Sequence, residues 1–133
     1  MINGKIVDTS VWIDYLNGVI DERTDYTVSL IEANDLCMLP VILQEVLQGI
    51  KDEKVFLKTK KAFLEHPFIS YNQIDMASDA ASLFRFLKVK GVTIRKPNDC
   101  LIAVICLKKN LSLLHNDKDF DNIAKYTSLK IYK

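Results

Sequence analysis

The sequence predicts an α/β protein built on a parallel β-sheet, and two observations support this fold class. Short apolar runs alternate with longer segments of helical periodicity, as in sheets whose strands are joined by helical crossovers. The chain has 133 residues, of which 49% are hydrophobic, and this is enough for one domain with a substantial core. Since no linker or repeat interrupts the pattern, we expect a single domain over residues 1–133.

Five short apolar runs are predicted to be strands, and seven segments between them are predicted to be helices. The strands are expected at Lys5–Val7, Leu36–Leu39, Phe68–Tyr71, Leu111–Leu114 and Leu129–Tyr132. The helices are expected near residues 10–17, 22–34, 41–50, 53–65, 74–90, 98–109 and 119–125. The lengths of the runs, more than their periodicity, separate strand from helix here.

Small and polar residues mark the ends of several of these segments. Thr9 and Ser10 are suited to cap the start of the first helix, because their hydroxyls can accept backbone N–H groups. Gly18 and Gly91 are suited to end helices. Apolar residues in 74–90 recur at the spacing of an amphipathic helix.

Composition limits where this protein works and what it can bind. The formal net charge is +1, so any binding of nucleic acid requires a local basic patch. The three cysteines are an odd number in apolar surroundings, which favours buried, reduced thiols. The longest apolar run, Cys100–Leu107, is too short to span a membrane, and Met1–Lys5 does not resemble a signal peptide. We expect a cytoplasmic protein with no membrane association.

Acidic residues stand at positions where the predicted fold would bring them together. Asp8 follows the first predicted strand and Asp117 follows the fourth, and ligands of parallel α/β sheets bind beyond such strand ends. Asp99 opens an apolar helix whose N-terminal dipole favours a carboxylate. Glu45 lies outside the apolar stripe of its helix, and Asp119 follows Asp117 closely. Each also has a structural interpretation, as a helix cap, a dipole partner or a solvated side chain.

Several carboxylates beside apolar segments are costly unless a cation or hydrogen bonds compensate them. Carboxylate oxygens are the ligands that Mg²⁺ prefers, and such a site serves phosphate chemistry. The sequence therefore predicts a site for Mg²⁺ or Mn²⁺ formed by these acids.

Read together, the acidic segments resemble a PIN domain, and specifically the VapC family of toxin ribonucleases. Their order, spacing and neighbours match the family over nearly the whole chain. The segments that carry the resemblance are Ile6–Asp14, Glu45–Gly49, Pro97–Ala103 and Leu114–Phe120.

The resemblance implies a three-layer PIN-like fold, with a five-stranded, mostly parallel sheet flanked by helices on both faces. It also implies that Asp8 and Asp99 are the primary metal ligands. His115 departs from the family, which usually has Thr two residues before the fourth acid, and we interpret it as a packed or surface histidine. The acidic site residues implied are Asp8, Glu45, Asp99 and Asp117, with Asp119 as a further ligand and with Ser10 and Asn116 supporting them.

The activity implied by the resemblance is Mg²⁺-dependent hydrolysis of RNA, with tRNA, rRNA or another structured RNA as substrate. The family further implies a homodimer and a VapB-like protein antitoxin. Arg95 and Lys96 lie beside Asp99 and are predicted to guide the phosphate backbone towards the acids.

Two other functions remain open at this point. A phosphohydrolase or phosphotransferase would use Asp8 as its nucleophile, but Ser10 stands where some such enzymes place a second aspartate. A non-catalytic RNA-binding protein on the same fold would not need all four acids, and this chain has them.

Overall fold

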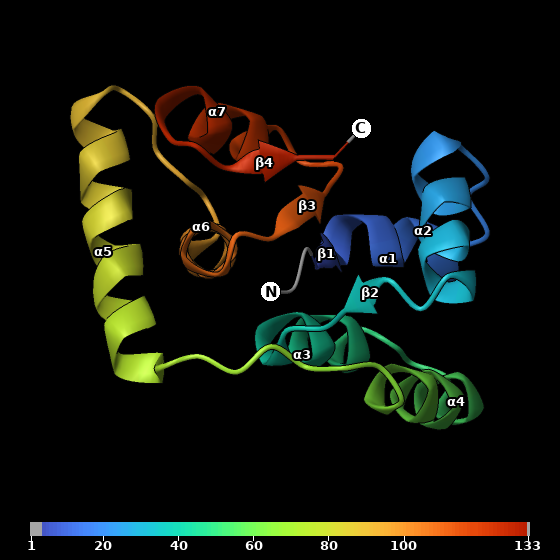
Figure 1. The fold of residues 1–133 in the computed structure, drawn as a ribbon. Helices are drawn as coiled ribbons and strands as arrows, with labels where there is room; N and C mark the ends of the chain where they lie inside the picture. Colours follow the sequence, from blue (N-terminus) through green and yellow to red (C-terminus); the bar gives the residue numbers. More distant parts are fainter. Residues whose placement is uncertain (1–3, 133) are drawn as a thin grey trace.

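The computed structural model describes residues 4–132, in which seven helices surround a sheet of four strands (Figure 1). The strands are β1 (Lys5–Val7), β2 (Leu36–Cys37), β3 (Ser112–Leu114) and β4 (Lys130–Ile131). The helices are α1 (Thr9–Leu16), α2 (Glu22–Glu32), α3 (Pro40–Gln48), α4 (Glu53–Leu64), α5 (Gln73–Val89), α6 (Pro97–Lys109) and α7 (Lys118–Tyr126). The predicted helices are confirmed to within about two residues at each end.

The sheet has the order β2-β1-β3-β4, and all three pairings are parallel. In the central pair, Ile6 of β1 is opposite Leu113 of β3. The backbone N–H of Asp8 continues this pairing by donating to the Leu114 carbonyl at 2.9 Å. Because the strands are parallel, the residues that follow β1 and β3 meet at the same edge of the sheet.

The prediction of a fifth strand at Phe68–Tyr71 is wrong for the described residues. Phe68 forms only an isolated parallel bridge with Met38, and the Ile69 N–H donates to the Met38 carbonyl at 3.0 Å. Beyond Met38, Leu39 is already the N-cap of α3, which begins at Pro40. The neighbouring chain therefore turns away before a longer ladder can form.

Helices cover both faces of the sheet, as the α/β prediction requires. In Figure 1, α5 and α6 lie on one side of the strands, and α1 and α2 lie on the other. The core between these layers is completely buried at the strand residues Ile6 and Leu113 and at the helical residues Ile102 and Ile105. The central helix α6 is buried along most of its length, because it packs between the sheet and α5.

Two helix ends behave as predicted, and one start does not. Gly18 and Gly91 follow the ends of α1 and α5 with positive φ angles of 79° and 85°, which glycine adopts without strain. At the start of α1, however, the cap is Asp8 and not Thr9 or Ser10. Thr9 and Ser10 lie one and two residues after this cap, inside the first turn.

The cysteines and the helices bear on the predictions of reduced thiols and of no membrane-spanning segment. Cys37, Cys100 and Cys106 are buried free thiols. No helix within residues 4–132 combines the length and the apolar character needed to cross a bilayer. Residues 1–3, on which the prediction about a signal peptide partly rests, lie outside the described residues.

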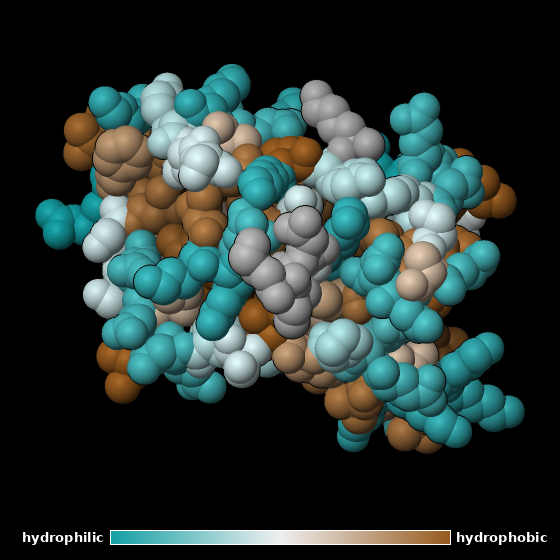
Figure 2. All heavy atoms as spheres, in the orientation of Figure 1, coloured by the Kyte–Doolittle hydropathy of each residue, from teal (hydrophilic) through white to brown (hydrophobic). Residues whose placement is uncertain are grey.

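Figure 2 shows hydrophobic spheres gathering on the side of the molecule where α5 lies, and α5 leaves Ile74 and Val89 exposed.

Candidate active site

Asp8 is held at the end of β1 by its role as the cap of α1. Its Oδ2 accepts hydrogen bonds from the backbone N–H of Ser10 at 3.0 Å and from the Ser10 hydroxyl at 2.6 Å. The side chain is only 3% exposed. Burial raises the pKa of Asp8, and the two bonds from Ser10 oppose that rise.

Asp99 is equally buried but much less well compensated. It lies in the first turn of α6, where Pro97 begins the helix, and it is 3% exposed. Its Oδ2 accepts no hydrogen bond from any residue of 4–132. Burial and then the negative charge of Asp8 raise the pKa of Asp99 to about 7. A buried carboxylate oxygen without a donor is rare in folded proteins and calls for an explanation.

Asp117 and Asp119 reach the same place from the end of β3. Asp117 caps α7 and accepts the backbone N–H of Asp119 at 3.0 Å. Burial tends to raise the pKa of Asp117, but that N–H and the Lys96 ammonium outweigh it, and the pKa is lowered. Carboxylate oxygens of Asp99, Asp117 and Asp119 all lie within 4.8 Å of one another. We call these three residues the carboxylate cluster.

Glu45 approaches from α3 on the outer side of this region. Its Oε1 accepts the Thr9 hydroxyl at 2.7 Å, and its Oε2 accepts the Asn98 side-chain amide at 3.2 Å. Glu45 is half-buried and is not a member of the carboxylate cluster, yet its charge contributes to the raised pKa values of Asp8 and Asp99. The fold thus brings all five predicted acids into one region at the strand ends.

This region fits a hard divalent cation by two observations. The cluster offers three oxygen ligands at mutual distances suited to one ion, and Asp99 Oδ2 has no protein donor in the described chain. Repulsion among the carboxylates is what a cation would relieve. Mg²⁺ and Mn²⁺ both match an all-oxygen donor set.

Two cationic residues predicted to bind RNA are instead found paired with the cluster. The Lys96 ammonium lies 3.0 Å from Asp117 Oδ2, and this partner raises the Lys96 pKa. Arg95 Nε lies 3.7 Å from Asp119 Oδ2, and its backbone N–H donates to the same oxygen at 3.4 Å. Both side chains remain more than half exposed, so each can also reach a ligand at the cluster.

Ser10 and Asn116, the two residues predicted to support the acids, lie in one chain of hydrogen bonds, in which only Ser10 contacts a predicted acid. Ser10, besides donating to Asp8, accepts the backbone N–H of Asn116 at 2.9 Å. The Asn116 side chain donates to Asp14 Oδ2 at 3.0 Å. Ser10 therefore joins the end of β1 to the loop after β3, and it fixes the two strand ends relative to each other.

His115 is packed, as the sequence interpretation proposed, but it also has a defined polar role. It is 7% exposed and lies against Phe120, with ring centroids 5.3 Å apart. Its Nδ1 accepts the backbone N–H of Asp117 at 3.0 Å, and its Nε2 lies 3.3 Å from Asp121 Oδ1. Burial lowers the pKa of His115, which keeps the ring neutral and able to accept this N–H.

Three supporting contacts were not foreseen from the sequence. Thr9 and Asn98 fix Glu45, and both are direct neighbours of predicted acids, which is the signal that could have identified them. Arg23 Nε donates to the His115 carbonyl at 3.0 Å from a position 92 residues away. No local pattern in the sequence indicates that contact.

Comparison with known proteins shows the family to which this chain belongs. The family model described as the PIN domain matches residues 5–126, which is most of the chain. The chain belongs to the PIN-domain family. Among curated PIN-domain relatives, VapC ribonuclease Mb1587 of Mycobacterium bovis and ribonuclease VapC11 of Mycobacterium tuberculosis are each 28% identical over 127 residues. Each match covers 94% of this chain and 95% of the relative.

Solved structures share the PIN fold at lower sequence identity. The VapBC2 complex of Rickettsia felis, bound to a promoter DNA fragment, contains a chain that matches with a TM-score of 0.74 and 22% identity. That match covers 96% of both chains. VapBC-1 from nontypeable Haemophilus influenzae matches with a TM-score of 0.72 and 23% identity, over 97% of this chain and 96% of that one. These likenesses support the fold.

Proposed function

We propose that this PIN-domain protein is a metal-dependent endoribonuclease and the toxin of a toxin–antitoxin pair. The observation that carries the proposal is the buried Asp99 oxygen without a donor inside a cluster of three carboxylates. The curated relatives named ribonucleases support the choice of RNA as substrate. The substrate class is tRNA, rRNA or another structured RNA, and the protein acts in the cytoplasm as one domain.

The metal is Mg²⁺ or Mn²⁺, and its proposed ligands are the acids of the strand-end region. Asp99, Asp117 and Asp119 hold it most directly, because their oxygens lie within 4.8 Å of one another. Asp8 stays among the proposed ligands, since its charge acts strongly on Asp99. When bound, such an ion supplies Lewis acidity to a phosphate oxygen and to the attacking water.

The other side chains position the reactants. Glu45 is fixed at both carboxylate oxygens by Thr9 and Asn98, which supports it as the group that accepts a proton from the attacking water. Water adds to phosphorus and passes a proton to Glu45 or solvent, while the bond to the leaving oxygen breaks and that oxygen takes up a proton from solvent. Ser10 keeps Asp8 oriented, and His115 keeps Asp117 oriented, each by a hydrogen bond.

RNA is held by the cations at the edge of the cluster. Lys96 and Arg95 are exposed at their tips and lie beside the proposed ligands. A metal in the cluster would neutralise the carboxylates, and the positive charges of Lys96 and Arg95 would then attract a phosphate group more strongly than they attract the carboxylates. This arrangement supports a position for the scissile phosphate next to the proposed metal ligands.

The partners proposed are a VapB-like antitoxin and a second copy of this chain. The solved VapBC complexes with this fold support the first partner. The exposed apolar residues of α5, Ile74 and Val89 among them, support an association surface for the second. Light scattering of the purified protein, at concentrations from micromolar upward, would give the mass of a dimer.

Cleavage of RNA tests the proposal directly. Purified protein is incubated with total cellular RNA and Mg²⁺ or Mn²⁺, and the cut ends are mapped. We expect discrete cuts that EDTA abolishes and that added Mg²⁺ restores. Cleavage that survives EDTA, or that Asp99→Asn leaves intact, contradicts the mechanism.

The alternative reaction at Asp8 has its own test. A phosphotransferase would form a phosphoaspartate at Asp8, which a phosphate analogue such as beryllofluoride mimics. We expect no such adduct, because Asp8 is buried and its Oδ2 already accepts two hydrogen bonds from Ser10. Trapping at Asp8 would favour the alternative.

A further inference from the structure

A second concave site lies beside the carboxylate cluster and is not used by the proposed reaction. It has a volume of about 640 Å³ and is bounded by the start of α2, the loop after β3, the first turns of α7 and the end of β4. Asp117 belongs both to the cluster and to the wall of this pocket. Small-molecule sites span roughly 300–1,000 Å³, so the pocket has room for a nucleoside.

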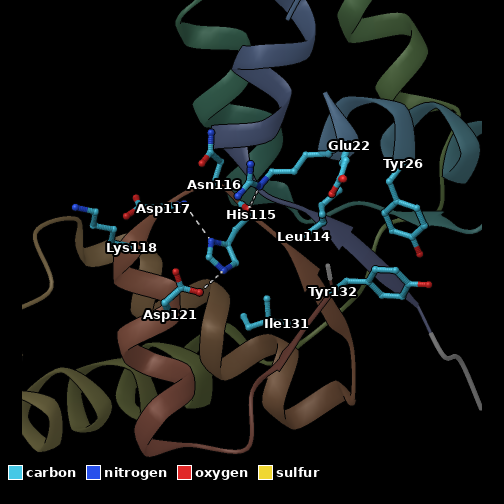
Figure 3. Close-up of a pocket in the computed structure, with 11 residues that line it drawn as sticks. Glu22, Tyr26, Leu114, His115, Asn116, Asp117, Lys118, Asp121, Ile131 and Tyr132 are labelled. Carbon is cyan, nitrogen blue, oxygen red and sulfur yellow. Dashed lines mark hydrogen bonds and ion pairs between the residues drawn. The ribbon is translucent and has the colours of Figure 1, made fainter. Parts of the chain in front are cut away.

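One end of the pocket is aromatic. Tyr26 of α2 and Tyr132 after β4 form a stacked pair, with ring centroids 4.3 Å apart and planes inclined by 13°. Each ring covers one face of the other, and Lys5 Nζ lies 5.6 Å from the centroid of the Tyr132 ring, so the second face of Tyr26 is the one assigned to stacking with a base. The backbone N–H of Tyr132 donates to the Leu113 carbonyl at 2.8 Å, so the sheet holds its backbone in place. Figure 3 shows the two rings at one side of the pocket and Asp117 and Lys118 at the other.

The pocket also offers hydrogen-bond acceptors. The carboxylates of Glu22 and Asp121 line it, and Asp121 Oδ1 lies 3.3 Å from His115 Nε2. Because His115 Nδ1 accepts the Asp117 N–H, the proton of the neutral ring is on Nε2 and points to Asp121. Arg23 Nε donates to the His115 carbonyl at 3.0 Å. His115 in the wall of the pocket is therefore fixed by contacts at both ring nitrogens and at its carbonyl.

We infer that this pocket binds an unstacked RNA base next to the phosphate that is cleaved, with preference for guanine. Single-stranded bases are recognised by stacking on aromatic side chains and by hydrogen bonds to their edges. Guanine presents two neighbouring N–H donors, which suit the two oxygens of a single carboxylate such as that of Asp121, whereas uracil offers one. The inference depends on the proposed function for its choice of RNA as the ligand.

The pocket lies next to the carboxylate cluster, so a base bound in it would determine which phosphate lies at the cluster. Asp117 and His115 form the shared wall, and His115 holds Asp117 by its backbone N–H. A base seated against the tyrosines places its neighbouring phosphate on the Asp117 side, where the cluster lies. The pocket therefore sets which bond is cut, and the cluster cuts it.

The test measures nucleoside binding without catalysis. EDTA-treated, ¹⁵N-labelled protein is titrated with guanosine and, separately, with uridine, and the amide resonances are followed. We expect saturable shifts for Leu114, Asn116 and Tyr132, with guanosine bound about tenfold more tightly than uridine, as charged hydrogen bonds allow. If neither nucleoside binds saturably, the inference is wrong.

Matched variants separate stacking from folding. Tyr132→Leu keeps apolar bulk but removes the ring, and it should weaken guanosine binding about fivefold or more. Tyr132→Phe should bind guanosine like the wild type, as should Tyr126→Ala, since Tyr126 is exposed on α7 and outside the pocket. Asp121→Asn should reduce the preference for guanosine over uridine. Equal binding by wild type and Tyr132→Leu overturns the inference.

RNA cleavage then distinguishes this inference from the function on which it rests. If the wild type cleaves RNA, Tyr132→Leu should raise KM and redistribute the cut sites while EDTA sensitivity stays unchanged. If the wild type binds guanosine but does not cleave RNA, the proposed function fails and the pocket assignment stands. If Tyr132→Leu weakens only binding of the antitoxin, the pocket serves a protein and the assignment to RNA is wrong.

Discussion

Two aspartates, one at the end of β1 and one in the first turn of α6, are equally buried but differ in the hydrogen bonds that they accept. Asp8 at the end of β1 receives two hydrogen bonds from Ser10. Asp99 in α6 has an oxygen that no residue of 4–132 satisfies, and its pKa is raised to about 7. Burial raises the pKa of both aspartates, but the Ser10 hydrogen bonds favour the anion of Asp8, whereas one oxygen of Asp99 has no donor within residues 4–132 and is suited to a cation. The comparison favours Asp99 as the proposed metal ligand that depends most on a cation, with Asp8 oriented by Ser10.

The largest expected effect comes from Asp99 itself. Asp99→Asn keeps the side-chain shape and removes the charge that a metal requires. We expect RNA cleavage to fall by about a thousandfold or more, equivalent to about 4 kcal/mol of transition-state stabilisation. Single-turnover assays in saturating Mg²⁺ would measure it, with the exposed Asp79→Asn on α5 as the matched control. Equal loss in both variants would mean that the assay reports general damage.

The same substitution should have the opposite effect on metal-free stability. The folded-state pKa of Asp99, about 7, is above its ordinary value of 3.8, so the folded protein keeps a proton that the unfolded chain has released. The wild type therefore loses stability as pH rises from about 4 to 7, by at most about 4 kcal/mol. Asp99→Asn does not titrate and should escape this loss.

Urea unfolding in EDTA at pH 4.5 and pH 8 would measure this difference. The variant should be the more stable protein at pH 8 and close to the wild type at pH 4.5. Saturating Mg²⁺ should reduce the advantage of the variant at pH 8, because the ion binds only the folded wild-type site. An advantage that is the same at both pH values would refute the raised pKa.

Ser10→Ala tests Asp8, the aspartate whose Oδ2 accepts hydrogen bonds from Ser10. It removes the 2.6 Å bond to Asp8 and the acceptor of the Asn116 N–H at 2.9 Å. Loss of a group that orients a metal ligand typically costs about 10-fold to 100-fold in metal affinity or activity. We expect Mg²⁺ affinity, measured by calorimetry, to fall within that range. Ser10→Thr should restore most of it, because the hydroxyl returns.

The smallest effect is expected from the cation that competes for the cluster. Lys96→Met removes the ammonium 3.0 Å from Asp117 and should tighten Mg²⁺ binding in the absence of RNA. An exposed ion pair contributes about 0.2–1 kcal/mol, so the gain should be at most about fivefold. Arg95→Met, whose Nε lies farther from its carboxylate at 3.7 Å, should gain less. Weaker Mg²⁺ binding in Lys96→Met would show that the lysine supports the site.

The sequence determined the elements and the positions of the acids. Apolar runs and helical periodicity are local properties, so the helices and the four strands follow from them. Parallel strands must also place their carboxyl ends at one edge, so residues after β1 and β3 meet whatever the details. For the same reason, the meeting of Asp8 and Asp117 could be predicted, whereas the expectation that Asp99 joins them came from the family resemblance.

The tertiary structure decided what each of those residues does. The prediction of a strand at Phe68–Tyr71 is wrong because Leu39 turns into α3, which is a property of the neighbouring segment. The unsatisfied oxygen of Asp99 and the pairing of Lys96 with Asp117 depend on distances between segments far apart in the chain. The pocket of Tyr26 and Tyr132 joins residues more than one hundred positions apart. Sequence patterns record which side chains are present, but burial and contact across the fold decide which of them lack a partner.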